Sequence, residues 1–587
     1  MQQQRLILAL VISTAILILW SYFYPVKSPQ PTPPSATPPA ETTATGAAAS
    51  TTPTAQATPA PVANAAPRRT LLIKTPLYEA KFDSLGAEPI SWIIKKNRNS
   101  GRDIFSVAGN KRSPVSLELI SPEGLKRQPR EVPLQIITGD SGLDSALRES
   151  TYRIEGVEGD GDVTADLIPG EKKQITFAFE GSNGLQVRKT LQFNADLYET
   201  DLTVSINRSG SVPQAKITIG PSIGDQGVSH HTFYSVAPEA IAYVNNKIER
   251  HQPAGINTNK NSPDRLALGG ESDWAGVGDT YFAMVAVPDK KREGVEYRTV
   301  SYEKQVNGKP EKNYLVTAWI PISADGSRTV VYAGPKDHYL LTEASKQVSS
   351  VVQRPIDLEG LIDYGFLGWL SRPLAVPILR CITFLFRLTS SYGVAIILFT
   401  ILVYSLFFPL KWRSSKAMKK AQKLAPRMKE LQEKIKGMKQ TDPRLKELQM
   451  EQLRLMKEGN PLGGCLPLLI QMPFLFALYR AITISLDFRQ ATFLWLPDLS
   501  SGDPYHILEV LMAGTMIVLQ LITPAPSADP MQRKVMAIGM PMFMLYVLWG
   551  APSGLLVYWL VGNIVGFSQQ FLINRWTKTQ DDVVFAK

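Results

Sequence analysis

Long apolar runs lie at the start of the chain and again over its last two hundred residues. Residues 6–24 form the first run, which follows Arg5 and ends in aromatic residues. Nineteen helical residues span roughly 28 Å, about the thickness of a bilayer core. The run is longer than the core of a usual signal peptide, and no A-x-A cleavage site adjoins it. The pattern therefore predicts an uncleaved transmembrane anchor at 1–24, with a signal peptide as the alternative.

Five further apolar spans are predicted near 392–410, 465–486, 506–523, 535–550 and 554–574. Basic residues flank the ends of these spans on one side of the membrane: Arg533, Lys534, Arg575, Lys578 and the loop 411–460. Cytoplasmic loops carry an excess of lysine and arginine. The pattern therefore predicts six spans, with both termini in the cytoplasm and the segment between the first two spans on the outer face.

The segment between the first two spans changes character along its length. Residues 25–67 are rich in Pro, Ala and Thr and cannot bury a core, so they form an extended tether. From 68 to 350 short alternating runs follow, separated by turn residues, as in 185–193, 198–206, 280–288 and 313–320. Runs of period two without helical patterns between them predict an all-β sandwich domain.

Residues 351–390 include an apolar stretch, 366–388, that contains three arginines. Arg372, Arg380 and Arg387 are spaced by eight and seven residues, which places them on one side of a helix. This pattern favours an amphipathic helix on the outer membrane surface. A poorly made spanning helix is the alternative.

Most of the excess positive charge lies in one segment of the chain, residues 411–460. The chain has 587 residues, 44% of them hydrophobic, and a formal net charge of +11. Residues 25–360 hold 37 basic and 38 acidic residues, whereas 411–460 alone has a net charge of +9. A single basic segment fits this distribution better than a general nucleic-acid-binding surface. We therefore expect no DNA partner. Two cysteines, Cys381 and Cys465, exclude a disulfide framework.

No enzyme is predicted from the motifs. The sequence contains no G-x-x-x-x-G-K-[ST], H-E-x-x-H or G-x-S-x-G pattern. The adjacent His230 and His231 cannot both face one metal from a strand, and we expect no metal or cofactor site. Ser553 and His506 are the candidate pair for an intramembrane serine protease, but a structural turn at Ser553 is the preferred interpretation.

The basic loop 411–460 predicts a cytoplasmic coiled-coil hairpin. Its first half has a seam of apolar residues at spacings of 4, 3, 4 and 3: Leu424, Met428, Leu431, Ile435 and Met438. Asp442 and Pro443 make a good start for a second helix. The other faces are basic and are candidates for docking ribosomal RNA or anionic lipids: Lys416, Lys419, Lys420, Lys423, Arg427 and Lys429. Topology and solubility alone would also explain these charges.

Polar residues occur inside several of the predicted spans. Thr400 and Tyr404 lie one helical turn apart in the second span; Gln471, Arg480 and Thr483 lie in the third, and Asn563 in the last. Such groups normally face protein or water, and hydrogen bonding between helices is the ordinary explanation. No carboxylate lies near the middle of a span, which weakens a proton-coupled transporter.

Several segments, taken in order, resemble the YidC/Oxa/Alb family of membrane protein insertases. The core segments are NPLGGCLPLLIQMPFLFALYR (460–480), SYGVAIILFTILVYSLFFPL (391–410), LPDLSSGDPYHILEVLM (496–512), DPMQRKVM (529–536) and PSGLLVYWLVGN (552–563). The outer segment is similar to the longer Gram-negative type through WAGVGDTYFAMVAVP (274–288) and VYAGPKD (331–337).

This resemblance implies an insertase and folding chaperone of the bacterial inner membrane. It implies a five-helix core with a hydrophilic groove, plus the N-terminal anchor, a periplasmic β-supersandwich and a cytoplasmic tail at 576–587. The implied partners are nascent membrane proteins, the ribosome, the Sec translocon (SecYEG and SecDF) and anionic lipids. The candidate groove residues are Thr400, Tyr404, Gln471, Met472, Leu475, Arg480, Trp559 and Asn563.

One position departs from the family pattern. The resemblance implies an arginine one turn after Thr400, and Tyr404 stands there instead. Arg480 is a candidate replacement for this charge, but it lies about 10 Å from the outer end of its span by helical rise, and snorkelling to the outer surface is favoured.

The sequence therefore predicts a multi-domain membrane protein with six α-helical spans at 1–24, 391–410 and 461–575. It combines an all-β periplasmic domain at 68–350 with a helical hairpin, and its function is insertion rather than catalysis. A small-molecule transporter and a membrane-tethered carbohydrate-binding protein are the alternative functions.

Overall fold

The computed structural model describes residues 66–585 in part. It leaves out 110–111, 160, 182–183, 209–210, 229–235, 260–261, 307, 366–367, 437, 439–443, 460, 524–530 and 532–533, and the side chains at 306, 309, 456–470 and 577–585. The N-terminal anchor, nearly all of the tether, His230 and His231 therefore lie outside the described residues.

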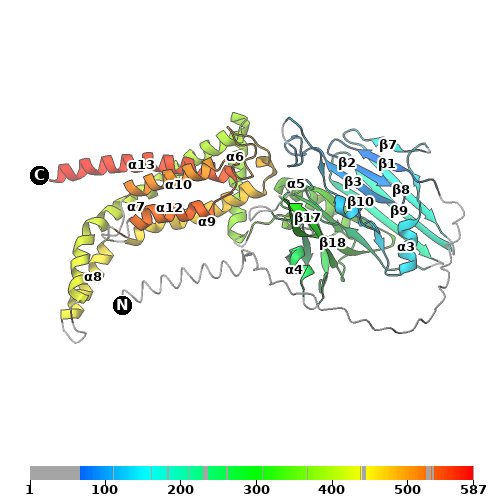
Figure 1. Cartoon of the computed structure of the whole chain (residues 1–587), viewed down its shortest axis with the longest axis horizontal. Helices are drawn as coiled ribbons and strands as arrows, with labels where there is room; N and C mark the ends of the chain where they lie inside the picture. The colour runs from blue at the N-terminus through cyan, green and yellow to red at the C-terminus, as the bar shows by residue number, and fades with distance from the viewer. Residues whose placement is uncertain are drawn as a thin grey trace, which may run out of the picture. The chain divides into compact units, whose positions relative to one another are not determined.

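Three sheets make up the β domain (Figure 1). The first has the order β4(Leu117–Glu118)-β3(Glu88–Ile94)-β2(Tyr78–Asp83)-β1(Thr70–Lys74)-β7(Val163–Asp166). The second has the order β13(Lys247–His251)-β12(Glu239–Val244)-β15(Ser272–Gly278)-β16(Phe282–Val287)-β19(Asp325–Pro335)-β10(Glu199–Arg208)-β9(Leu185–Asn194)-β8(Lys172–Glu180)-β6(Arg153–Glu155). The third has the order β14(Arg265–Ala267)-β17(Glu296–Val306)-β18(Lys309–Ile322)-β11(Ala215–Ile219)-β5(Ile136–Ile137). All strand pairs are antiparallel except β1 with β7, which is parallel.

The strands predicted from alternating patterns are confirmed. Strands β9 and β10 bury every second side chain, as a sheet with one covered face requires. The predicted runs 280–288 and 313–320 correspond to β16 and to part of β18. Strand β15 is buried along its whole length, because the third sheet covers one of its faces through β18.

The first sheet packs on the other half of the nine-stranded sheet. Phe82 of β2 lies against Phe177 of β8 and Phe193 of β9, with ring centroids 5.7 and 5.8 Å apart. Aromatic pairs at such separations add to the burial of their apolar area. The nine-stranded sheet is thus the central layer that holds both smaller sheets in place.

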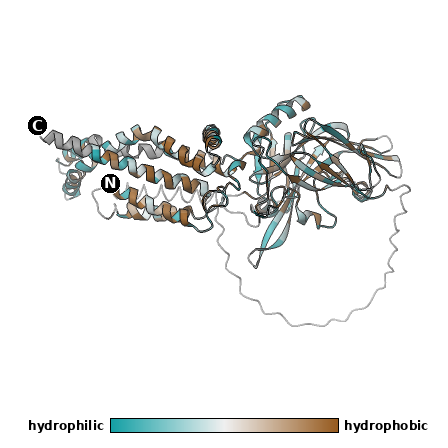
Figure 2. Ribbon diagram, turned by 90° about the horizontal axis from the view of Figure 1, so that it is seen from above, coloured by the Kyte–Doolittle hydropathy of each residue, from teal (hydrophilic) through white to brown (hydrophobic). Residues whose placement is uncertain are grey.

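Short helices lie within or directly after the β domain, and long ones follow. The short ones are α2(Pro122–Leu125), α3(Ser141–Glu149), α4(Pro253–Asn257), α5(His338–Val352) and the 3₁₀ turn η2(Glu359–Leu361). The later ones are α6(Gly368–Thr389), α7(Tyr392–Lys436), α8(Arg444–Gly459), α9(Pro461–Ile484), η3(Leu486–Phe488), α10(Ile507–Ile522), the π-helical turn η4(Val535–Gly539), α12(Met540–Val547) and α13(Ser553–Phe585). In Figure 2 the later helices are largely brown, that is, hydrophobic, whereas the β domain mixes hydrophilic and hydrophobic residues.

Three of the described helices are long and apolar enough to cross a membrane: Gly368–Thr389, Tyr392–Lys436 and Ser553–Trp576. Ile507–Ile522 and Val535–Val547 are apolar but shorter. By length and composition α6 therefore qualifies as a span, so its expected position on the membrane surface stays a prediction. The second span and the first arm of the predicted hairpin form one continuous helix of 45 residues, which runs through Pro409 and Pro426.

Helices α7 and α8 lie against each other beyond the apolar part of α7. Arg427 of α7 makes an ion pair with Glu451 of α8 at 2.9 Å. Leu431, one of the predicted seam residues, is buried, and so is Leu455 of α8. Packing of apolar residues at coiled-coil spacing accounts for this contact.

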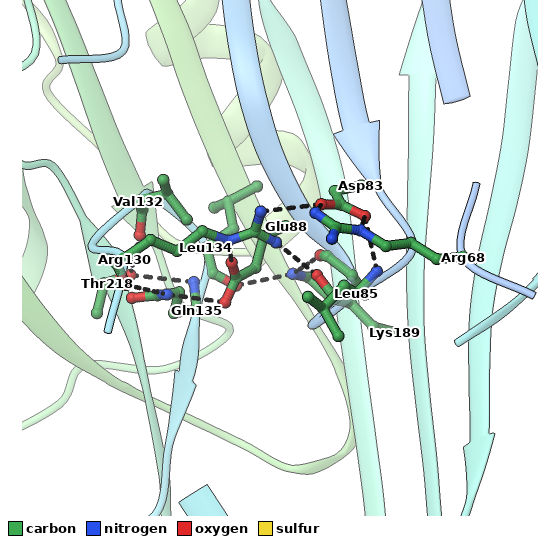
Figure 3. A network of polar contacts seen from close by, with 11 residues as sticks. Arg68, Asp83, Leu85, Glu88, Arg130, Val132, Leu134, Gln135, Lys189 and Thr218 are labelled. Carbon is green, nitrogen blue, oxygen red and sulfur yellow. Dashed lines mark hydrogen bonds and ion pairs between the residues drawn. The ribbon is translucent and has the colours of Figure 1, made fainter. Parts of the chain in front are cut away.

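A buried charged network joins the sheets of the β domain (Figure 3). Arg130 lies between two carboxylates, 2.9 Å from Asp83 and 2.5 Å from Glu88. Gln135 donates a further hydrogen bond to Glu88 at 2.7 Å. Buried charges are tolerated where partners satisfy them, and here each carboxylate has more than one donor.

Lys189 of β9 is fully buried beside this network. Its ammonium donates to the backbone oxygens of Ala87 at 2.6 Å and Leu134 at 2.7 Å. Burial lowers the pKa of Lys189 to about 8, although the nearby Glu88 carboxylate opposes this shift. The lysine thus links β9 to Ala87, directly before β3 of the first sheet, and to Leu134 in the loop before β5. Neither of these two carbonyl oxygens pairs with a neighbouring strand.

We predict that Lys189 makes the stability of the β domain depend on pH. An unfolded lysine keeps its proton up to its ordinary pKa of 10.5, whereas buried Lys189 loses it near pH 8. Between these values the unfolded state binds more protons, so the free energy of unfolding rises with pH by as much as about 3 kcal/mol. Urea unfolding of the full chain in detergent, followed by the fluorescence of buried tryptophans, measures this rise. In Lys189→Met the rise should be smaller but still present, because burial also lowers the pKa of Lys336 to about 8. Parallel pH profiles for the two proteins would contradict the prediction.

Candidate functional site

One face of α7 carries a row of polar residues that turns toward α13. Thr400, Tyr404, Lys411 and Ser415 are spaced by four, seven and four residues, which places them on the same side of a helix. Helix α13 packs along α7, and α9 contacts both (Figure 1). The row therefore lies inside the bundle and not on its outer surface.

Tyr404 lies where the three helices meet. Its hydroxyl accepts a hydrogen bond from the amide of Gln471 on α9 at 3.2 Å. Its ring meets that of Tyr558 on α13 edge to face, with centroids 6.2 Å apart. Gly562 gives the room for this arrangement, since a Cβ there would lie 2.7 Å from Cζ of Tyr404. Glycine at 562 thus sets how closely the tyrosine approaches α13.

Two buried polar atoms beside Tyr404 make no direct hydrogen bond within 3.5 Å among the described residues, although the amide of Gln471 lies near one of them. They are the hydroxyl of Tyr558 and the side-chain oxygen of Gln569. The amide nitrogen of Gln569 donates to the backbone oxygen of Tyr404 at 2.9 Å. Buried polar atoms are nearly always satisfied by protein or by water, so these two are places where water or a polar chain can bind.

The row continues toward the end of α7 that leads into α8. Lys411 donates to the backbone oxygen of Gly566 at 2.8 Å. Four residues later Ser415 accepts a hydrogen bond from Gln570 at 3.1 Å. The same two helices therefore hold polar side chains together over three turns.

Thr400 and Asn563 are satisfied in other ways. The hydroxyl of Thr400 donates to the backbone oxygen of Ile396 in its own helix at 2.7 Å. Asn563 donates to the backbone oxygen of Met512 on α10 at 3.2 Å and lies 3.1 Å from the hydroxyl of Thr515. Asn563 thus has the ordinary role of a hydrogen bond between helices.

Arg480 does not lie with Tyr404. Its guanidinium is 3.7 Å from the carboxylate of Asp363, which precedes α6, and it packs closely against Gly365. Snorkelling toward the outer end of the span predicts such a position, whereas a replacement for a charge beside Tyr404 would not occupy it. Of the remaining candidates, Met472 is 39% exposed, and Leu475 and Trp559 pack partly buried against the core.

The loop after α9 binds the β domain through buried polar contacts. Arg489 is almost fully buried, forms an ion pair with Asp225, and donates to the backbone oxygen of Phe105 at 2.6 Å. Arg102 donates to the backbone oxygen of Asp487 at 2.8 Å. Nothing in the local sequence pattern marks these residues, because their partners lie more than 250 positions away.

Ser553 and His506 do not form a catalytic pair. The hydroxyl of Ser553 donates to the backbone oxygen of Ser501 at 2.8 Å. The ring of His506 lies 3.1 Å from Glu509 and stacks on Trp549. Both residues therefore serve the structure of the turns that connect the spans.

The candidate docking residues follow α7 beyond Trp412. Lys416 lies over the ring of Trp412, and Arg427 makes the ion pair with Glu451. The exposed residues of the set are Lys416, Lys420, Lys423, Arg427 and Lys429, whereas Lys419 is half-buried. A basic surface is thus available on this helix.

Lys411, Tyr558 and Gln569 were not among the candidates from sequence. A lysine directly after an apolar span is ordinarily a flanking charge, and a tyrosine within a span is ordinarily core. The spacing of seven residues between Tyr404 and Lys411 is the signal that would have placed the lysine on the same face.

Comparisons with known proteins match this architecture. The family model of the 60Kd inner membrane protein matches residues 384–581, and that of the YidC periplasmic domain matches 71–377. A membrane protein insertase YidC from Citrifermentans bemidjiense is 32% identical, with 98% of this chain and 99% of the relative covered. Another from Syntrophus aciditrophicus is 30% identical, with 97% and 99% covered.

A solved structure of an active YidC insertase covers 86% of this chain and 94% of its own, at 18% identity and a TM-score of 0.32. The assignment therefore rests on the family models and the sequence relatives. These define the class as membrane protein insertases of the inner membrane, not enzymes. The chain belongs to the YidC family.

We predict that Gly562→Ala disrupts the contact between α7 and α13. The added methyl group would overlap the ring of Tyr404, and overpacking of this kind costs about 1–3 kcal/mol. The midpoint of thermal unfolding in detergent should fall. Gly514→Ala on α10 is the matched control, because a Cβ there meets nothing within 4 Å. Equal midpoints for the two variants would show that Tyr404 moves aside freely.

Proposed function

We propose that this chain inserts nascent membrane proteins through a hydrophilic groove between α7, α9 and α13. The short polar tail of a client enters beside Tyr404 and Gln471, and its apolar span leaves sideways into lipid. The observation that carries this proposal is the pair of buried, incompletely satisfied polar atoms on Tyr558 and Gln569 next to Tyr404. They offer hydrogen bonds to water or to a passing chain.

The proposed mechanism is differential solvation. A charge at the centre of a bilayer costs about 2.5–3.5 kcal/mol on insertion scales. Polar side chains and water in the groove lower this cost for the client's tail. Burial of the client's apolar span in lipid then drives the step without a nucleotide or an ion gradient.

Short helices support the proposal. Helix α10 has 16 residues and so covers about 24 Å, less than the roughly 30 Å of a bilayer core. Such a mismatch is accommodated by local thinning of the bilayer. A thinner barrier shortens the distance that the hydrophilic tail has to cross.

The proposed orientation follows the distribution of basic residues. The loop 411–460 and the C-terminus lie in the cytoplasm, and the β domain lies in the periplasm, by the positive-inside rule. The surface that includes Lys416, Lys420 and Lys423 would then face the ribosome and anionic lipids, and the Sec translocon is a further proposed partner. Ribosomal RNA suits this surface because each neutralised phosphate releases counterions.

We predict that a photo-crosslinker at Tyr404 captures a stalled nascent chain. Ribosomes carrying a single-span client are added to the full-length protein in membranes, and crosslinks to the emerging span are measured. Position 404 should give a strong product, because it lies inside the bundle. Leu406, two residues further on and 73% exposed, is the matched control that faces away from the groove.

Three outcomes of this experiment would change the proposal. A product at Arg480 without one at 404 would move the polar path to α9. Equal products at 404 and 406 would show contact with the outside of the bundle only, and no product at any of these positions from a functional complex would contradict the groove.

We further predict that the basic surface of α7 binds ribosomes in a salt-dependent way. Replacing Lys416, Lys420, Lys423 and Lys429 with Gln should weaken binding and reduce the slope of log K against log salt by at most about 3. Replacing the exposed Glu430 and Glu433 on the same helix with Gln should tighten binding. If ribosome binding is unchanged in both variants, these lysines serve only to fix the membrane topology of the chain.

A further inference from the structure

Two arginines lie directly opposite each other on the outer face of the third sheet of the β domain. Arg265 of β14 pairs with Arg298 of β17 in the antiparallel register. Tyr297, the neighbour of Arg298 in β17, is fully buried, so Glu296 and Arg298 point away from the core. Like charges directly opposite each other destabilise an antiparallel pair, so this arrangement needs an anion nearby.

A single carboxylate supplies part of the negative charge that these arginines need. One oxygen of Glu296 accepts hydrogen bonds from Nε of Arg265 at 2.5 Å and from Nε of Arg298 at 2.6 Å. The other oxygen lies 3.7 Å from the ammonium of Lys216 on β11. Among the residues that the structure describes, no other carboxylate lies within 4 Å of either guanidinium. Three cations thus share one anion, which leaves two positive charges unmatched.

Trp319 of β18 fixes the plane of one of the two guanidiniums. The guanidinium carbon of Arg298 lies 3.4 Å from the centroid of the indole ring. Stacking on an aromatic face pre-organises the donors of an arginine. Each arginine has five N–H donors, and both Arg265 and Arg298 use the one on Nε to bind Glu296. Their terminal nitrogens make no hydrogen bond to the described residues and are open to a ligand.

The arginine pair lies beside a covered part of the same face and is itself accessible. Thr317, which pairs with Arg298, donates to Glu131 at 2.5 Å. Glu131 lies 3.3 Å from Arg127, so its charge is already matched. The side chains of Arg265 and Arg298 are 52% and 38% exposed, which lets a ligand reach them from solvent. Exposed ion pairs add little to stability, so folding alone does not explain two opposed arginines.

We infer that Arg265 and Arg298 form a binding site for a phosphate group that carries two negative charges. Such a group matches the two positive charges that Glu296 leaves unmatched, whereas one carboxylate would match only one of them. Guanidinium groups bind phosphate oxygens through two parallel hydrogen bonds, and two guanidiniums on adjacent strands hold one phosphate between them. A soluble phosphate and a lipid headgroup that ends in a phosphate monoester share this chemistry. The site is separate from the insertion step and does not rest on it.

The test measures binding of inorganic phosphate to the full-length chain in a non-ionic detergent, by isothermal titration calorimetry at low ionic strength. Arg298→Gln should weaken binding about tenfold, because it removes one guanidinium from the site. Arg298→Lys keeps the charge but loses the paired donors, so it should weaken binding to a smaller extent. Glu296→Gln should tighten binding, since it removes the carboxylate that competes with phosphate for both arginines.

Arg328→Gln is the matched control for Arg298→Gln. Arg328 lies on β19, is 50% exposed and has one carboxylate partner, Asp201, at 3.7 Å. Its replacement should leave the affinity for phosphate unchanged. The basic loop 411–460 also attracts anions but is identical in both variants, so the difference between them reports on the sheet alone. The midpoint of thermal unfolding without phosphate shows whether each variant folds.

A second measurement separates the two sources of phosphate. Glycerol phosphate and a phosphatidic acid with short acyl chains carry the same phosphate monoester, and both are tested as competitors of inorganic phosphate. If the site binds a lipid headgroup, the phosphatidic acid should compete at about tenfold lower concentration than glycerol phosphate. If it binds soluble phosphate, the two should compete equally. Phosphatidylcholine with the same acyl chains should not compete, because choline neutralises its single phosphate charge.

Three outcomes overturn the inference. Equal affinities of the wild-type protein and Arg298→Gln would place the bound phosphate elsewhere, in the basic loop above all. No binding to the wild-type protein at millimolar phosphate would leave the two arginines only their contact with Glu296. A short peptide of aspartates that binds more tightly than phosphate, and loses this affinity in Arg298→Gln, would assign the arginines to acidic polypeptides. If Arg298→Gln does not fold, Arg298→Lys and Glu296→Gln decide, and unchanged affinity in both contradicts the site.

Discussion

Hydrogen bonding inside a bilayer is the constraint on which the helical part of this protein depends. A polar side chain there has to find its partner in another helix or in water, because lipid offers none. Asn563 meets this need through α10 and Thr400 through its own helix. Tyr558 and Gln569 do not meet it fully within the described residues. Two incompletely satisfied atoms therefore lie beside Tyr404, between α7 and α13, and a passing polar chain can bond to them.

Charge is handled differently in the two parts of the molecule. In the β domain, Arg130, Asp83 and Glu88 form a closed network in which each charge has partners. Arg489 extends the same principle to the loop after α9, where Asp225 neutralises it. Lys411 has no such partner among the described residues and lies on the face that includes Tyr404. Closed networks hold parts of a protein in place, and an open charge is available to a ligand.

Tyr404 occupies a position where this chain departs from the pattern of its family. The resemblance implies an arginine at this point, and the tyrosine removes a charge but keeps a hydroxyl that bonds Gln471. Arg480 was the candidate replacement from sequence, and it faces Asp363 instead. The tyrosine at position 404 thus leaves the polar row intact. The nearest cation without a counter-ion in the described part of this row is Lys411, which the local sequence would assign to the flank of the span.

Periodicity in the sequence determined the elements. Alternation of period two located β9 and β10, and apolar runs located α7, α10 and α13, since burial of one face or one span depends only on residues close in the chain. The same spacing placed Thr400 and Tyr404 on one face. Only the tertiary structure decided which face of α7 meets α13, that Arg480 pairs with Asp363, and that Arg489 reaches Asp225. Each of these depends on the approach of distant segments, and a local pattern carries no information about the partner that a side chain meets across such a distance.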